Sequence, residues 1–111
     1  MAVFHVLLSN DESLLFSASS DQKIIIWDTK KERSKLVLQG HSGSVYTLKQ
    51  SKNSKFLFSG SYDNTIIKWD LETFKIKDVF HGFYTYLSAM TFSNDYRILY
   101  SIDSENTNFI R

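Results

Sequence analysis

The sequence predicts an all-β protein built from repeated copies of one supersecondary unit. The segment Ser59–Asp70 (SGSYDNTIIKWD) is typical of a hairpin, because small and Asx residues favour a tight turn and a β-branched strand ending in Trp follows. A related segment, SASSDQKIIIWD, begins 42 residues earlier at Ser17, and SIDSENT begins 42 residues later at Ser101. A constant period of this length indicates stacked copies of one unit.

Apolar runs separated by polar turns predict the order of the strands. Residues 3–8 are apolar almost throughout, as expected of an inner strand buried on both faces. The polar turn SNDES follows, and strand and turn then alternate along the chain. The expected strands of the first unit are Val3–Leu8, Leu14–Ser19, Ile24–Trp27 and Lys35–Gln39, and those of the second are Val45–Lys49, Lys55–Ser61, Thr65–Trp69 and Lys75–Phe80. The third unit has expected strands at Leu87–Phe92 and Arg97–Ile102 and stops within its third strand at Asn108–Arg111.

The repeat resembles the WD-repeat β-propeller family. The SGSxD turn, the pairs Trp27–Asp28 and Trp69–Asp70, and the pair Gly40–His41 carry the resemblance, which covers nearly the whole chain. It implies one partial β-propeller domain of four-stranded antiparallel blades with an incomplete third blade. The expected blades are residues 1–39, 40–81 and 82–111.

The number of blades is too small to close a ring, because propellers typically have about 4 to 8. We therefore expect apolar, bare faces on the first and last blades and an open strand edge on the third. Three interpretations remain open: a piece of a larger propeller, a truncated product, or one subunit of a propeller assembled from several chains.

The resemblance also implies a structural hydrogen-bonded tetrad within each blade. A buried indole N–H needs an acceptor, and a hydroxyl can accept it and donate to an imidazole that a carboxylate holds. Blade two has the full set, which is His41, Ser59, Asp63 and Trp69. Blade one has the partial set Ser17, Asp21 and Trp27. Blade three retains Ser101 but has Phe83 in the histidine position and Glu105 in the aspartate position.

A Ser–His–Asp set also suggests a hydrolase, which requires an exposed nucleophile, an oxyanion hole and a cleft. Here the three residues belong with a buried Trp, and no nucleophile-elbow sequence surrounds Ser59. We therefore expect no enzymatic activity. No metal-ligand spacing or phosphate-binding glycine loop is present, so we expect no metal and no cofactor. His5, within an apolar strand, is expected to be a core histidine with a hydrogen-bond partner rather than a ligand.

Charge and cysteine content narrow the classes of partner and the compartment. The net charge of +1 argues against binding to nucleic acid or to a membrane. The chain has no cysteine, which is compatible with an intracellular protein, and we expect a cytoplasmic location. Two basic clusters are interpreted as solvated rims, with an anionic contact site as the alternative for each. They are Lys30, Lys31, Arg33 and Lys35, and Lys49, Lys52 and Lys55.

The function implied by the resemblance is a non-catalytic protein–protein interaction scaffold. One alternative is a structural subunit that completes a propeller with other chains or oligomerises through its open blade edges. Another is a targeting module of a longer polypeptide that contains an enzyme. The sequence does not identify the partner.

Strand alternation predicts which loops share a rim. The turns 20–22 and 62–64 should lie with the junctions 42–44 and 83–86, opposite the lysine-rich loops. Aromatic side chains are favoured interface anchors, because they bury a large area at a low entropy cost. The candidate partner contacts on this rim are Tyr62, Tyr84 and Tyr86. An open alternative is that Phe80 and Phe83 are core residues and only the tyrosines of this junction are exposed.

Overall fold

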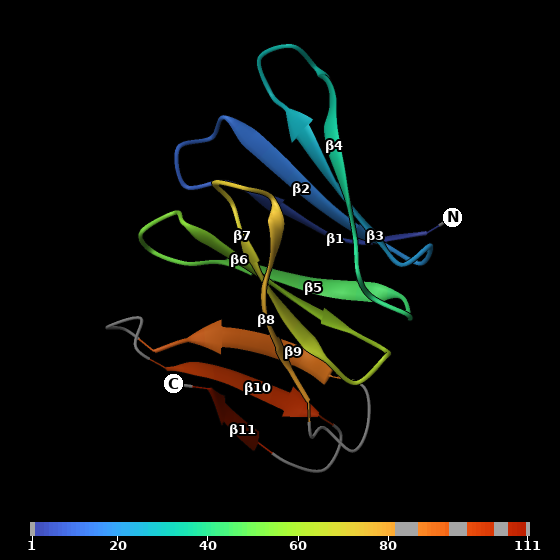
Figure 1. Ribbon diagram of the computed structural model, residues 1–111, viewed down its shortest axis with the longest axis vertical. Helices are drawn as coiled ribbons and strands as arrows, with labels where there is room; N and C mark the ends of the chain where they lie inside the picture. The colour runs from blue at the N-terminus through green and yellow to red at the C-terminus, as the bar shows by residue number, and fades with distance from the viewer. Residues whose placement is uncertain (1, 82–86, 94–97, 104–106, 111) are drawn as a thin grey trace.

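The computed structural model describes residues 2–81, 87–93, 98–103 and 107–110, and the regular structure in these ranges is entirely β-strand (Figure 1). The first sheet contains β1 (Val3–Leu8), β2 (Leu14–Ser19), β3 (Lys23–Asp28) and β4 (Arg33–Gln39). The second contains β5 (Val45–Gln50), β6 (Phe56–Ser61), β7 (Ile66–Asp70) and β8 (Lys75–Phe80). The third contains β9 (Leu87–Phe92), β10 (Leu99–Asp103) and β11 (Thr107–Ile110). No helix in these ranges is long and apolar enough to span a membrane.

Within each sheet, every strand pairs antiparallel with the next strand in the chain, so each sheet is a meander. The predicted order of strands is correct, and the strand ends differ from the expected ones by one or two residues. The sheets, which we call blades one, two and three, each fall within one of the ranges expected for a blade. The all-β, antiparallel architecture predicted from the sequence is confirmed.

The 42-residue repeat extends to irregularities of the backbone. Among the described residues, six that are not glycine adopt a positive φ, and they form three pairs at the repeat spacing: Glu12 with Ser54, Gln22 with Asn64, and Glu32 with Phe74. Register shifts also recur, at Val3/His5 and Val45/Thr47 in the inner strand pairs. Blades one and two therefore share turn geometry as well as strand order.

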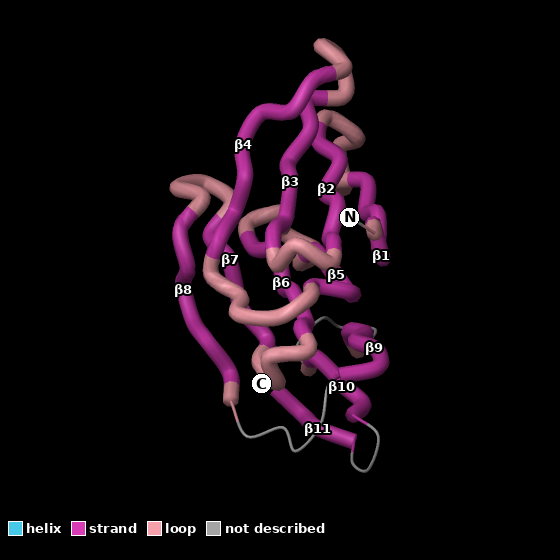
Figure 2. Tube along the Cα trace, turned by 90° about the vertical axis from the view of Figure 1, so that its right-hand side faces the viewer, coloured by secondary structure: helices cyan, strands magenta, loops and turns pink. Residues whose placement is uncertain are grey.

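The core lies between the blades rather than within any one of them. The β1, β5 and β9 strands line one side of the molecule, and β4 and β8 lie along the other (Figure 2). One buried cluster joins blades one and two, with Phe16, Ile24 and Leu48 among its members. A second cluster joins blades two and three and includes Phe58 and Met90. Each blade therefore obtains its burial from its neighbour, as in other repeat architectures.

The prediction that the first strand is buried on both faces is wrong. Four of its apolar side chains, Val3, Phe4, Val6 and Leu8, are between 45% and 53% exposed. Their counterparts in β5 include Val45 and Leu48, which are fully buried. The physical reason is that β5 packs against β1 and β2 of blade one, whereas the outer face of β1 has no sheet against it in this chain. Blade one thus carries the bare apolar face that the blade count predicts.

Candidate functional site: a buried tetrad and an aromatic rim

The structure brings the four predicted tetrad residues of blade two into one hydrogen-bonded chain. The indole Nε1 of Trp69 donates to Ser59 Oγ over 2.8 Å, and Ser59 Oγ lies 2.7 Å from His41 Nε2. His41 Nδ1 lies 2.9 Å from Asp63 Oδ2. Ser59 is completely buried, and His41 and Trp69 are also buried. Buried polar groups need such partners, so this chain satisfies groups that would otherwise destabilise the interior.

Each member of the tetrad comes from a different part of the blade. Ser59 lies in β6, Asp63 in the β6–β7 turn and Trp69 near the end of β7, while His41 lies between β4 and β5. Pairing of Ser59 with Ile67 sets the register of the hairpin. The tetrad therefore fastens the connection between blades one and two to the central hairpin of blade two.

Two residues that the sequence reasoning missed complete the binding of the Asp63 carboxylate. Thr65 donates to Asp63 Oδ1 from its backbone nitrogen at 2.9 Å and from its hydroxyl at 2.6 Å. The backbone nitrogen of Ser42 donates to Asp63 Oδ2 at 3.0 Å. The Asp–Asn–Thr order at 63–65 is the available signal, because an Asx side chain often accepts from a backbone N–H two residues later.

Close backbone approach explains two glycines next to the tetrad. A Cβ on Gly40 would lie 2.9 Å from Ile76 Cδ1 and 3.0 Å from Trp69 Cη2. A Cβ on Gly43 would lie 2.8 Å from the backbone nitrogen of Asp63. Glycine at these positions lets the chain before and after His41 pack directly on the hairpin.

The protonation states follow from burial and hydrogen bonding. Burial lowers the pKa of His41 below 6.5, although Asp63 opposes the shift. Burial raises the pKa of Asp63, but hydrogen bonds from Thr65 and His41 outweigh that effect and leave its pKa below 3.8. At neutral pH the imidazole is therefore neutral and the carboxylate is ionised. In this state His41 Nδ1–H donates a hydrogen bond to Asp63, and Nε2 accepts a hydrogen bond from the Ser59 hydroxyl.

The partial set of blade one does not form a single network. The indole of Trp27 donates to Ser17 Oγ over 3.0 Å, as its counterpart does in blade two. Asp21, however, accepts hydrogen bonds from the Ser19 hydroxyl and from the backbone nitrogen of Lys23. No imidazole bridges the two halves within the described residues, so each half stabilises only its own part of the hairpin. In blade three, Phe83 and Glu105 lie outside the described residues.

The tetrad geometry does not present a nucleophile. The Ser59 hydroxyl is buried and engaged by both Trp69 and His41, so it faces no cleft that could admit a substrate. In the described ranges, no group of three or more His, Asp or Glu side chains is arranged to hold a metal ion. His5 accepts a hydrogen bond from the backbone nitrogen of Leu48 at 3.2 Å and is partly buried.

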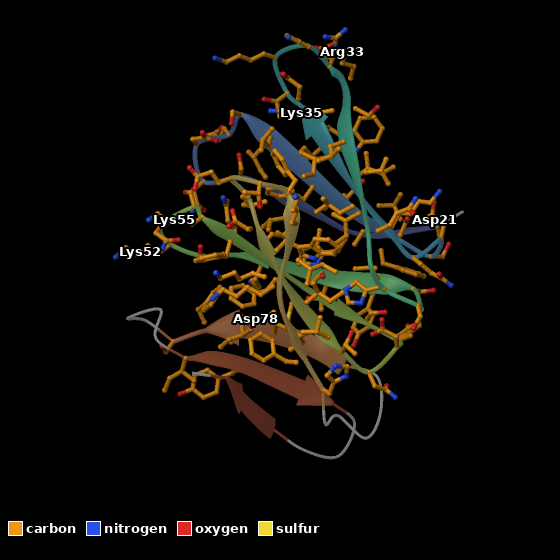
Figure 3. All side chains as sticks on the ribbon, viewed as in Figure 1. Asp21, Arg33, Lys35, Lys52, Lys55 and Asp78 are labelled. Carbon is orange, nitrogen blue, oxygen red and sulfur yellow. The ribbon has the colours of Figure 1, made fainter. Side chains whose placement is uncertain are left out.

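The second candidate site is the rim that contains Tyr62. Ser44 donates from its hydroxyl to the carbonyl of Ser20 at 3.2 Å, and Tyr62 donates from its backbone nitrogen to the carbonyl of Ser44 at 3.0 Å. These bonds bring the 20–22 turn, the 42–44 junction and the 62–64 turn together. Figure 3 shows Asp21, in the first of these turns, on the opposite side of the molecule from Lys52 and Lys55.

Aromatic side chains from two blades meet on this rim. Tyr62 is 48% exposed, and its ring centroid lies 4.7 Å from that of Tyr46 and 6.5 Å from that of Phe4. Phe4 comes from β1 and Tyr46 from β5, and neither was predicted to join the rim. The other predicted contacts, Tyr84 and Tyr86, lie outside the described residues.

Contacts between the loops on the opposite rim were also missed. The Asn10 side-chain nitrogen donates to the carbonyl of Ser51 at 2.9 Å and to Ser54 Oγ at 3.0 Å. The backbone nitrogen of Asn10 donates to Gln50 Oε1 at 2.8 Å. Asn10 therefore joins the β1–β2 turn of blade one to the β5–β6 turn of blade two. No local sequence pattern contains this information, because the partners are about forty residues apart.

Comparison with known proteins agrees with this geometry. A family model described as "WD domain, G-beta repeat" matches residues 1–28 and 32–70, and no curated protein matches the chain. Two solved structures, titled "Structure of U3-55K" and "Crystal structure of RRP9 WD40 repeats", are each 27% identical in sequence to this chain, with a TM-score of 0.85. Both comparisons cover 91% of this chain but only 33% and 32% of the respective solved chains. Such repeats generally serve as non-catalytic scaffolds for protein interactions. The chain belongs to the WD40 repeat family.

Proposed function

We propose that this chain is a non-catalytic interaction scaffold whose partner protein binds the aromatic rim at Tyr62. The observation that carries the proposal is that Tyr62 is 48% exposed while its ring stacks on Tyr46 at 4.7 Å. A ring already held by a neighbour loses little conformational freedom when a partner covers it. Exposed but ordered tyrosines are therefore suitable interface anchors.

The surroundings of Tyr62 also favour a rigid contact surface. Its backbone is hydrogen-bonded to Ser44, and Ser44 is in turn hydrogen-bonded to Ser20 of blade one. The rim thus joins two blades, and a partner that binds there would contact both. Tyr84 and Tyr86 remain proposed contacts on the same rim.

The test compares variants in a pull-down of binding partners from cell extract. We expect Tyr62→Ala to weaken capture by more than about 1 kcal/mol, or about five-fold. Tyr62→Phe keeps the stacked ring and serves as the matched control, so it should retain the partner. Tyr84→Ala and Tyr86→Ala should resemble Tyr62→Ala.

A charge variant in the lysine-rich loop tests the alternative that partners bind there rather than at the aromatic rim. Lys31→Glu should change mainly the salt dependence of association with the rim partner. Loss of partners with Lys31→Glu alone, and none with the tyrosine variants, would overturn the aromatic-rim proposal.

A second candidate role is that of a structural subunit that completes a propeller with other blades. The observation that favours it is the bare face of β1, where Val6 is 53% exposed although its repeat counterpart Leu48 is fully buried. The surface that covers Leu48 is another blade. A blade from elsewhere would therefore be a suitable cover for the equivalent face of blade one.

A further inference from the structure

The β3–β4 connection of blade one gathers cations around a cleft of about 380 Å³. Its lining consists of Asp28, Lys31, Arg33, Ser34 and Lys35. The three cationic side chains are exposed, and Figure 3 shows Arg33 and Lys35 at one end of the molecule. The cleft is thus accessible from solvent and lies in one compact hairpin.

The single aspartate of this cleft offsets only one of its three positive charges. Asp28 Oδ1 accepts the backbone N–H groups of Lys30 at 2.9 Å and Lys31 at 3.0 Å, so the carboxylate is used to hold the turn. These backbone hydrogen bonds lower the pKa of Asp28, which is therefore ionised at neutral pH. In the part of the chain that the structure describes, neither Lys31 nor Arg33 forms an ion pair within 4 Å. The cleft consequently keeps an excess of positive charge.

Blade two provides an internal control for the shape of this loop. Asp70 Oδ1 accepts the backbone N–H groups of Glu72 at 2.8 Å and Thr73 at 3.3 Å, as Asp28 does 42 residues earlier. Phe74 has a φ of 59° and its counterpart Glu32 a φ of 53°, so the turns share their left-handed residue. The same backbone therefore forms with a different set of side chains.

The charges of the two loops differ although their backbones agree. Lys30 and Lys31 of blade one stand where blade two has Glu72 and Thr73. The turn consequently does not require these lysines for its geometry. Lys31 lines the cleft together with Arg33 and Lys35, and binding of an anion fits the chemistry of these three cations.

We propose that this cleft binds acidic side chains of a partner protein. The Arg33 guanidinium can pair with a carboxylate through two parallel hydrogen bonds, and Lys31 and Lys35 add positive charge beside it. A volume of about 380 Å³ is sufficient for one or two such side chains. This surface is separate from the Tyr62 rim, and the inference does not depend on the proposed role of that rim.

The composition of the cleft favours a peptide over a nucleic acid. Its lining includes the ionised Asp28, which would repel a phosphodiester backbone, and no aromatic ring on which a base could stack. The net charge of the whole chain is also only +1. An isolated carboxylate can avoid Asp28, whereas a continuous polyanion has less freedom to do so.

The experiment is a fluorescence anisotropy titration of the protein with a labelled peptide of about ten residues that carries two glutamates among uncharged residues, at several salt concentrations. We expect Arg33→Gln and Lys31→Thr to weaken binding by at least about five-fold each, since each variant removes a cation that can pair with a glutamate carboxylate. Lys31→Thr introduces the residue that blade two carries in the same turn, so the loop should retain its shape. Arg33→Lys keeps the charge but loses the bidentate geometry and should give an intermediate affinity.

The matched control is Lys75→Gln, which removes the same charge from the corresponding position of the blade-two loop. It should change the affinity by less than about two-fold, because the blade-two loop has Glu72 and Thr73 where blade one has Lys30 and Lys31. Equal weakening by Arg33→Gln and Lys75→Gln would show unspecific attraction and overturn the proposal. Absence of peptide binding, or tighter binding of a single-stranded RNA of about ten nucleotides, would also overturn it.

Discussion

His41 illustrates how one side chain links local chemistry to the stability of the fold. It bridges Ser59 and Asp63, and so joins the connection before β5 to the central hairpin of blade two. We expect His41→Ala to lower the free energy of unfolding by about 1 to 3 kcal/mol at pH 7.5, because buried polar partners lose their hydrogen bonds. Chemical denaturation measures this loss. Ser17→Ala is the control, since its hydroxyl accepts only from Trp27 and belongs to no histidine network.

The same residue predicts a pH dependence of stability. The pKa of folded His41 lies below 6.5, so the unfolded state binds more protons as the pH falls through that region. Stability is therefore greatest above about pH 6.5 and decreases as the pH falls toward the folded pKa. Asp63, whose folded pKa lies below 3.8, adds a further loss at more acidic pH.

The measurement is the difference in unfolding free energy between the wild-type protein and His41→Ala, determined at pH 7.5 and again at pH 5. That difference should narrow with acid, because only the wild-type protein must protonate this imidazole. The pKa of His5 is also lowered by burial and by Lys49, so the variant retains a smaller slope of the same sign. A His41→Ala effect that is constant across this range would contradict a buried, neutral imidazole.

At the scale of the element, the turns rather than the strands contain strained backbone. Glu32 and Phe74 occupy the same left-handed position in consecutive blades, with φ of 53° and 59°. Glu32 is exposed, whereas Phe74 is partly buried and packs against the core that joins blades one and two. Packing of the Phe74 side chain therefore offsets the cost of the left-handed backbone in blade two, whereas the exposed Glu32 side chain provides no such packing in blade one.

This contrast predicts opposite effects of the same substitution. Glu32→Gly should be neutral or should raise the free energy of unfolding by up to about 1 kcal/mol, because glycine adopts a positive φ without steric cost. Phe74→Gly gains the same relief but loses apolar contacts, so it should be destabilising by about 1 to 3 kcal/mol. Thermal and chemical unfolding of both variants would test the argument. A destabilised Glu32→Gly would mean that the side chain supports the turn.

At the scale of the whole molecule, blade-to-blade packing predicts how the chain behaves in solution. The outer face of blade one exposes Val3, Val6 and Leu8, whose equivalents in an inner position would be covered by another blade. Repeats that bury their core only against neighbours need capping surfaces. We expect the isolated chain to be oligomeric, aggregated or only marginally stable.

Analytical ultracentrifugation of the purified chain would decide this point. Val6→Lys places a charge on the bare face and should reduce self-association, whereas Lys52→Glu on a loop should not. A monomer with sharp, cooperative unfolding would contradict the expectation and indicate that the two inter-blade cores are sufficient.

Much of the fold follows directly from local patterns in the sequence. The 42-residue recurrence of a turn followed by a β-branched strand specifies hairpins, their order and their spacing. Three tetrad residues of blade two, Ser59, Asp63 and Trp69, lie within a single hairpin motif, and the family resemblance supplies the fourth, His41. These features are short-range, so neighbouring residues contain the information needed to predict them.

The tertiary structure decided which surfaces are covered and which distant groups meet. The inner strand of blade one is exposed because burial depends on the sheet that lies against it, and the apolar run at residues 3–8 does not report that neighbour. Asn10 is hydrogen-bonded to the loop of blade two, and the Tyr62 ring lies near that of Phe4, so both contacts join different blades. The exposed cleft beside Arg33 likewise results from the shape of a loop, which its charges alone do not specify. Local sequence therefore determined the hairpins, whereas packing between the blades determined which side chains are exposed and which distant residues meet.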